Sequence, residues 1–289
     1  MTDMRYEAPE TLEAAVALLD AAGDGGKVFA GGTDVLVQLH AEMIEPDVLV
    51  DIKNIPDVRE MREDGGVWYV GAAVPGMQVI GDPGFSAAWP GVCEGVALIG
   101  SVQVKGRATI GGNLCNASPA ADSVPALIAA GAEAIIIGPG GTFEEHIHNI
   151  VTGPGQNSLS DGEFIVSFRF PKRPPHSGDC YLRLTPRTEM DIAVVGVGVN
   201  LTLDDAGTCT AARVGLGAVA PRPLLVEDAG AALVGTTVDA AALDAMEEAV
   251  RAACNPITDK RGTREYRIKT AGVMARRAAE KALERAKAN

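Results

Sequence analysis

The sequence contains no C-x-x-C pair. Its five cysteines, an odd number, are widely separated: Cys93, Cys115, Cys180, Cys209 and Cys254. This spacing describes neither a zinc site, an iron–sulfur site nor a disulfide framework, and it fits a protein of a reducing compartment. We therefore interpret most of the thiols as small core residues.

Long apolar runs are also missing. No stretch approaches the roughly 18 apolar residues that span a bilayer, and the N-terminus MTDMRYEAPE lacks the pattern of a secretory signal. We expect a cytoplasmic protein that does not insert directly into a membrane. No Ser-His-Asp order or paired-carboxylate arrangement supports hydrolase chemistry, and the H-x-H of His146 and His148 lacks a nearby third metal ligand.

Acidic residues predominate, with 38 Asp and Glu against 25 Lys and Arg and a net charge of −13. The final segment, 259–289, is the exception: its ten basic and four acidic residues give +6 and leave −19 for the rest. An acidic body argues against nucleic-acid binding. For the basic end we prefer a solvated helix face, with a docking surface for a partner subunit as the alternative.

The order of elements predicts an α+β fold with two domains. In 1–174, a small βαβ-like subdomain (about 1–55) precedes a larger α+β subdomain (56–174), and 175–289 forms an α+β domain of strands followed by helices. Pro171, Pro174, Pro175 and Gly178 indicate the linker. We expect helices between Pro9 and Gly23 and at 35–43, 77–80, 87–99, 123–130, 224–234, 240–253 and 263–286, and strands at 28–30, 48–52, 61–64, 67–70, 134–137, 164–170, 181–184, 192–203 and 209–219.

Two glycine pairs organise the first domain. In the first, the apolar strand Val28 to Ala30 runs into Gly31-Gly32, and Thr33 and Asp34 can cap the helix that begins near Val35. The second pair lies in Thr109–Asn113, TIGGN. Glycine lets backbone amides approach an anion without hindrance from a Cβ atom. Together the pairs predict one phosphate-binding surface, although a single pair more often only marks a turn.

Six sequence blocks resemble one family. AGGTD (30–34), ATIGGN (108–113), SPAAD (118–122), RTEMDIAVVGVGVN (187–200), GAVAPRP (217–223) and TREYRIKTAGVMARRA (263–278) are similar to the flavoprotein, or medium, subunits of the molybdenum hydroxylases of aerobic carbon monoxide dehydrogenase and xanthine dehydrogenase type. The resemblance implies that domain 1–174 binds FAD. It further implies electron transfer from a small subunit with [2Fe-2S] clusters and a large subunit with molybdopterin, in a dimer of heterotrimers.

The resemblance also implies which residues contact FAD. These are Val28, Phe29, Ala30, Gly31, Gly32, Thr33, Asp34, Val35, Ile99, Thr109, Ile110, Gly111, Gly112, Asn113, Asp122, Ile165 and Arg183. Asp122 is equally well explained as a helix N-cap, and the two isoleucines as core residues. A guanidinium at position 183 would stabilise the negative charge of a reduced flavin. We also expect Cys115 to lie near the cofactor.

Other features keep alternatives open. Relatives commonly carry Ile-Arg-Asn before TIGG, whereas this chain has Val104-Lys105-Gly106-Arg107, which leaves the position of the cation open. We interpret Arg187, close to Glu189 and Asp191, as a partner in a local salt bridge. A freestanding flavin oxidoreductase and a flavin-free assembly subunit remain the rival functions.

Overall fold

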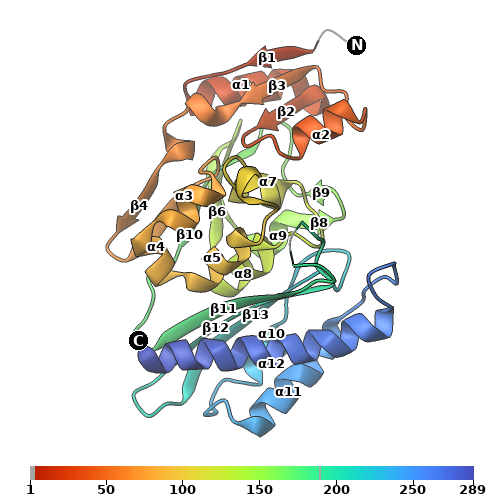
Figure 1. The fold of residues 1–289 in the computed structure, drawn as a ribbon. Coiled ribbons are helices and arrows are strands. Elements are labelled where there is room, and N and C mark those ends of the chain that lie inside the picture. The colour runs from red at the N-terminus through yellow and green to blue at the C-terminus, as the bar shows by residue number, and fades with distance from the viewer. Residues whose placement is uncertain (1–3, 189) are drawn as a thin grey trace.

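The computed structural model describes residues 4–188 and 190–289. Its N-terminal part is a small parallel sheet of order β1-β3-β2. This sheet and its helices lie at the top of Figure 1 and contain β1 (Arg5–Glu7), α1 (Leu12–Ala22), β2 (Gly26–Phe29), α2 (Val35–His40) and β3 (Val48–Asp51). Thr11 caps α1 by accepting a hydrogen bond from the Ala14 amide, and Gly23 ends it at φ 56°. The predicted βαβ-like subdomain is present, with β1 as an additional strand.

A five-stranded antiparallel sheet of order β4-β5-β10-β6-β7 forms the next layer. Its strands are β4 (Met61–Asp64), β5 (Val67–Gly71), β6 (Glu133–Gly138), β7 (Gly141–His146) and β10 (Phe164–Phe170). Gly65 and Gly66 turn the first hairpin at φ 59° and 93°, as their pairing predicts. Strand β6 was predicted, but its hairpin partner β7 was not. The residues of β7 are mostly polar and exposed, so they lack the alternating pattern of a strand.

Short helices cover this sheet and build its core. They are α3 (Gly76–Gly81), α4 (Pro83–Ala88), α5 (Pro90–Ala97), α6 (Val102–Lys105), α7 (Ile110–Cys115), α8 (Ser123–Ala130) and α9 (Ile147–Ile150), with the small β8 (Val151–Gly153) and β9 (Gln156–Asn157). Phe85, Phe168 and Phe170 are fully buried among them. Three 3-10 turns, Gly23–Gly25, Ile52–Asn54 and Asp57–Arg59, complete the connections.

The C-terminal sheet lies between two helical layers (Figure 1). Its strands run in the order β11 (Ser177–Leu184), β12 (Val195–Leu203), β13 (Cys209–Gly217) and β14 (Leu224–Leu225). Gly198 and Gly215 face the Pro125 carbonyl of α8, where a Cβ atom would come within 2.4 and 2.3 Å. The alternate valines of β12 face the other side, where they pack with α11 (Ala240–Ala253) and α12 (Arg264–Ala288). Glycine on one face and valine on the other thus follow the strand period of two.

Several predicted boundaries need correction. The helix expected over 35–43 ends at His40, and the one expected over 87–99 is divided at Trp89 into α4 and α5. The expected linker ends earlier, because β11 already begins at Ser177 and includes Gly178. The strand expected from residue 192 begins at Val195. The helix expected over 224–234 is replaced by β14 and the short α10 (Glu227–Ala231). The proposed domain boundary at 174/175 falls between β10 and β11 and stays a prediction. In the part of the chain that the structure describes, no helix is long and apolar enough to cross a membrane.

Candidate functional site

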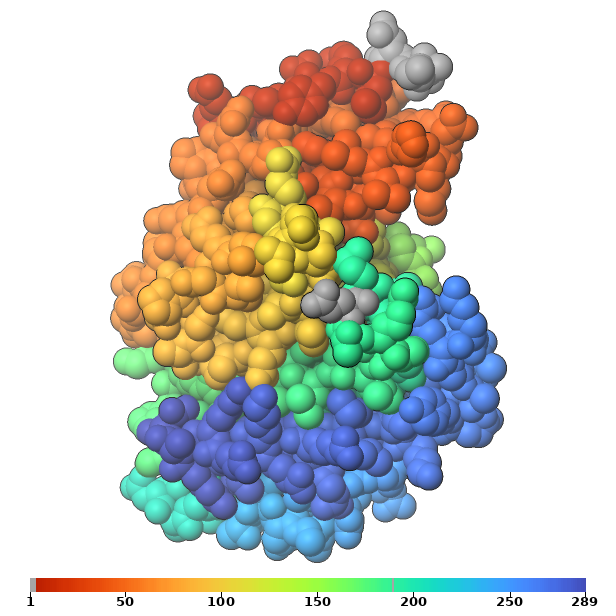
Figure 2. Space-filling view, in the orientation of Figure 1, coloured from red at the N-terminus to blue at the C-terminus, as the bar shows by residue number. Residues whose placement is uncertain are grey.

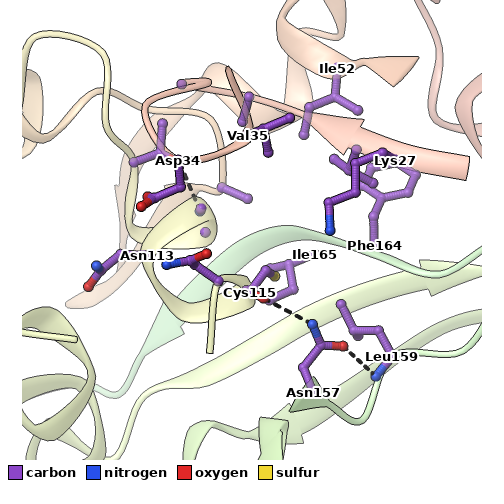
Figure 3. A pocket seen from close by; sticks show the side chains of 18 of the residues that line it. Lys27, Asp34, Val35, Ile52, Asn113, Cys115, Asn157, Leu159, Phe164 and Ile165 are labelled. Atoms are coloured by element: carbon purple, nitrogen blue, oxygen red, sulfur yellow. Dashed lines mark hydrogen bonds between the residues drawn. The ribbon is translucent and has the colours of Figure 1, made fainter. Parts of the chain in front are cut away.

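A cavity of about 310 Å³ opens where the small parallel sheet meets the larger subdomain (Figure 3). Three segments line it: the first glycine loop, the second glycine loop with α7, and the segment 157–165 that leads into β10. In Figure 2 the surface near α2 borders that of the second loop. A hydrogen bond of 3.0 Å from Gln38 of α2 to Asn116 after α7 connects the two sides. The site therefore depends on residues that are far apart in sequence.

The first loop runs from the end of β2 into α2. Among the described residues, no hydrogen-bond acceptor is found for the amides of Gly32, Thr33, Asp34 and Val35. Asp34 occupies the N-cap position, but its side chain makes no capping hydrogen bond, so the predicted cap is wrong. Its carboxylate instead lines the cavity, where burial raises its pKa. This segment offers hydrogen-bond donors to a ligand.

The second loop is a short helix turn. Thr109 caps α7 by accepting a hydrogen bond of 2.9 Å from the Gly112 amide. The Gly111 amide has no acceptor within the described ranges 4–188 and 190–289. Asn113 fixes the following segment, because its side-chain oxygen accepts hydrogen bonds from the amide and hydroxyl of Ser123 at 3.3 and 2.6 Å. Hydrogen bonds of Thr109 and Asn113 therefore fix both ends of the second loop.

The glycines have different physical roles. A Cβ atom at Gly31 would lie 2.1 Å from the Arg107 carbonyl oxygen, so the first loop packs directly against the start of the second. A Cβ at Gly111 would lie 2.6 Å from the Ala72 carbonyl oxygen. Gly32 has φ 74°, a conformation that favours glycine. A Cβ at Gly112 would approach only the Thr109 hydroxyl, at 3.2 Å. Only Gly112 thus leaves room for a ligand without also being required by the fold.

A Tyr–Asp–Lys cluster supports the first loop. The Tyr6 hydroxyl donates to Asp51, and the Lys53 ammonium lies 2.7 Å from the same carboxylate and 3.0 Å from the Ala30 carbonyl oxygen. Burial raises the pKa of Asp51, but hydrogen bonds from Lys53 and Tyr6 outweigh this effect and leave it below its usual range. A trans peptide points its C=O and N–H in opposite directions, so Lys53 also fixes the direction of the Gly31 amide.

A Tyr–Asp–Arg cluster lies behind the second loop. Asp122 accepts hydrogen bonds from the Tyr181 hydroxyl at 2.9 Å and from Arg183 at 2.8 Å. Burial raises the pKa of Asp122 to about 6, only partly opposed by Arg183 and Tyr181. Its side chain makes no capping bond to α8, so the alternative explanation as an N-cap is wrong. Arg183 also donates to the Leu98 carbonyl oxygen at 3.1 Å, beside Ile99.

Most residues expected to contact the cofactor line the cavity. Those that do are Val28, Ala30, Gly31, Gly32, Thr33, Asp34, Val35, Ile99, Thr109, Gly111, Gly112, Asn113 and Ile165. The four that do not are Phe29, Ile110, Asp122 and Arg183. Phe29 and Ile110 are buried in the protein, and the other two pair with each other. Their contact with a cofactor remains a prediction.

Apart from Ile165, sequence reasoning missed the third wall of the cavity. Asn157 donates to the Cys115 carbonyl oxygen at 3.1 Å and accepts from the Leu159 amide at 3.1 Å, which brings 157–165 against α7 (Figure 3). No motif marked this segment. Lys27 was also missed, as it is an ordinary strand residue by pattern. Cys115 lines the cavity as expected, and burial raises the pKa of its thiol to about 12. It is therefore a neutral thiol.

The remaining candidates behave as structural residues. Arg187 lies 3.6 Å from Asp191, which confirms the local salt bridge, whereas Glu189 lies outside the described residues. His146 and His148 stack at 5.3 Å. Within the described ranges, no group of three or more His, Cys, Asp or Glu residues could hold a metal ion. The five cysteines are free thiols.

The cavity between the two glycine loops fits a phosphate-bearing cofactor, and comparisons with known proteins identify the class. A family model described as "FAD binding domain in molybdopterin dehydrogenase" matches residues 2–173. A second, "CO dehydrogenase flavoprotein C-terminal domain", matches residues 181–282.

Similar proteins match along nearly the whole chain. The carbon monoxide dehydrogenase medium chain of Afipia carboxidovorans is 35% identical over 98% of this chain and 97% of its own. The putative xanthine dehydrogenase FAD-binding subunit of Escherichia coli K12 is 32% identical, covering 96% and 95%. A chain in the crystal structure of Cu,Mo-CO dehydrogenase superposes with a TM-score of 0.93 at 34% identity over 98% of both chains. The protein belongs to the FAD-binding flavoprotein subunits of the molybdenum hydroxylase family, which are oxidoreductases.

The residues of the cavity fit FAD. Gly112 leaves room for a ligand beside the second loop, unpaired amides provide donors for phosphate oxygens, and apolar side chains such as Ile99 and Ile165 provide surface for flat rings. No other cofactor is indicated by these residues.

Proposed function

We propose that this chain carries FAD as the electron-transfer subunit of a molybdenum- and iron–sulfur-containing hydroxylase or dehydrogenase. The observation that carries the proposal is the pair of glycine loops in direct contact, with unpaired backbone amides at the cavity. Such amides can hold the FAD diphosphate. When bound, FAD accepts electrons singly and passes them on singly or in pairs.

The partners follow from the relatives. The relatives named above include a medium chain and a FAD-binding subunit, names that describe parts of larger assemblies. We propose a small partner with [2Fe-2S] clusters that delivers electrons and a large partner with molybdopterin that acts on the substrate. A dimer of heterotrimers in the cytoplasm is the corresponding assembly, and free thiols are typical of that compartment.

The chain's own residues would bind and orient the cofactor. The two loops hold the diphosphate, Asp34 is placed to accept a hydrogen bond from a hydroxyl, and Ile99 and Ile165 exclude water. Arg183 is held behind Ile99 by Asp122 and the Leu98 carbonyl oxygen. We propose that its charge stabilises the reduced, negatively charged flavin.

The test uses the full chain with and without its small partner. The FAD-loaded chain is mixed anaerobically with the reduced iron–sulfur subunit, and the visible absorbance of the flavin is followed. The proposal predicts that the flavin is reduced only when that subunit is present. Reduction by NADH or a small substrate alone would instead favour a freestanding flavin oxidoreductase, and absence of FAD even from the co-expressed complex would favour an assembly subunit.

A further inference from the structure

More acidic than basic side chains line the cavity. Three are acidic, Asp34, Asp161 and Glu163, and within the described part of the chain a single basic side chain, Lys27, faces them. A diphosphate that entered this cavity would meet repulsion from the carboxylates, which partial charges on backbone amides only partly offset. The ammonium group of Lys27 is the formal positive charge that the cavity offers.

Lys27 is placed for this role. It lies in β2, four residues before Gly31, and Figure 3 shows its side chain directed into the cavity. Within residues 4–188 and 190–289 no carboxylate lies within 4.0 Å of its ammonium group, and it donates no hydrogen bond. Its positive charge therefore has no partner among the residues that the structure describes.

Nearby cations differ from Lys27 in this respect. Lys53 is also beside the first loop, but its charge is paired with Asp51 at 2.7 Å. Lys105 and Arg107, the basic residues that precede the second loop, do not line the cavity. The cation that the sequence left unplaced before TIGG is thus not a cavity residue, whereas Lys27 is.

We propose that Lys27 is a phosphate-binding residue of this site. Its ammonium group pairs with a phosphate oxygen of FAD and makes the cavity favour a flavin that carries phosphate over riboflavin. The proposal rests on the FAD-binding function proposed above. Lysine binds phosphate as a point charge, so the interaction depends on charge and not on a single geometry.

The test measures flavin affinity in the full chain after removal of bound flavin. Fluorescence titrations with FAD and with riboflavin compare the wild type with K27Q, K27R and K287Q, the last a control at an exposed residue of α12. K27Q is expected to bind FAD about 10- to 100-fold more weakly, the loss of one charge-assisted hydrogen bond, with riboflavin affinity unchanged. K27R is expected to retain most of the FAD affinity, and K287Q all of it.

Salt gives a second readout. Added salt is expected to weaken FAD binding to the wild type more than to K27Q, because the variant lacks the screened charge. An equal loss of FAD and riboflavin affinity in K27Q would show a structural role and overturn the proposal, as would an unchanged FAD affinity. If the isolated wild-type chain does not bind FAD, the same variants are compared in the co-expressed complex. A wild-type complex without FAD would overturn the proposed function itself.

Discussion

The two glycine loops are supported by clusters of the same composition, each with a tyrosine, an aspartate and a cation, yet the two aspartates have opposite pKa shifts. Asp51, between Tyr6 and Lys53, has a lowered pKa. The pKa of Asp122, between Tyr181 and Arg183, is raised to about 6. The donors differ in number: Asp51 accepts from the Lys53 backbone amide at 3.0 Å as well as from the Tyr6 hydroxyl and the Lys53 ammonium, whereas Asp122 accepts from the Tyr181 hydroxyl and Arg183.

This difference shows that one further hydrogen-bond donor can decide whether a carboxylate withdrawn from water stays ionised. At Asp51, the three donors outweigh the effect of burial and favour the ionised carboxylate. At Asp122, the free-energy cost of removing the carboxylate from water exceeds the stabilisation of its charge by Arg183 and Tyr181, so the pKa stays raised. The first cluster therefore supports its loop through charge, and the second through packing and shared hydrogen bonds.

The largest effect is expected where the two loops touch. The substitution Gly31→Ala should push the first loop away from the second. Its methyl group would overlap the Arg107 carbonyl, which is backbone and cannot move aside. We expect a loss of about 3 kcal/mol in the free energy of unfolding and loss of bound FAD. Urea unfolding and flavin content measure both. The control is Gly81→Ala at the end of α3, where the backbone is not left-handed and a Cβ meets nothing within 4 Å. Retention of FAD in a stable Gly31→Ala chain would contradict loop contact.

The next effect concerns the opposite pKa shifts. Because the pKa of Asp122 is about 6 in the folded chain and 3.8 unfolded, its contribution to stability is present below pH 4 and is lost as the pH rises through 6. The two-unit difference corresponds to up to about 3 kcal/mol. Asp122→Asn should therefore gain stability relative to wild type between pH 4 and 6, as urea unfolding at each pH would show.

Asp51→Asn is the matched variant and should behave in the opposite way. A lowered pKa makes the stability contribution of Asp51 present above its unfolded pKa and lost as the pH falls through the folded one. The variant should thus be less stable than the wild type near neutral pH, with a difference that shrinks in acid. The same pH dependence for both variants would refute the contrast between the clusters.

A smaller effect separates the two glycines of the second loop. Gly111→Ala places a methyl group 2.6 Å from the Ala72 carbonyl oxygen and should cost about 2 kcal/mol. Gly112→Ala meets only the Thr109 hydroxyl at 3.2 Å and gains helix propensity, so its stability should change by less than about 1 kcal/mol. Thermal or urea unfolding of both variants makes the comparison. Equal costs would mean that the loop is packed differently.

The smallest effect is expected at Lys53. Lys53→Met removes a partly buried ion pair and the hydrogen bond to Ala30, which should cost about 1 kcal/mol and weaken FAD binding through a less ordered first loop. Lys53→Arg keeps the charge and is the matched control. Unfolding and FAD titration should change together in the methionine variant; unchanged values in both would show that the first loop needs no such support.

The sequence predicted those parts of the site that depend on local backbone chemistry. Gly31, Gly32 and Thr109 are recognisable because glycine pairs and caps have local signatures. Apart from Ile165, which the family resemblance implied, the wall formed by 157–165 was not predictable, because its position results from β10 pairing between β5 and β6.

Local sequence patterns also could not predict which side chains pair with each other in the folded chain. Asp122 and Arg183 were both identified as candidates, but their 2.8 Å ion pair joins residues 61 positions apart, and only the folded chain shows it. Likewise Lys27 has the pattern of any strand lysine until the cavity in front of it is seen. The general architecture was predictable because strand and helix periods are strong in 195–217 and 240–288, whereas the short helices before the second loop were less regular.

The central claim is that FAD lies across the two glycine loops, and FAD titration of Gly112→Val tests it most directly. Gly112 lines the cavity and its Cβ direction is largely free, so a larger side chain should fill ligand space while the chain still folds. We predict one FAD per wild-type chain, and no bound FAD in the variant at nearly unchanged unfolding free energy. A folded Gly112→Val chain that binds FAD as tightly as the wild type would contradict the account.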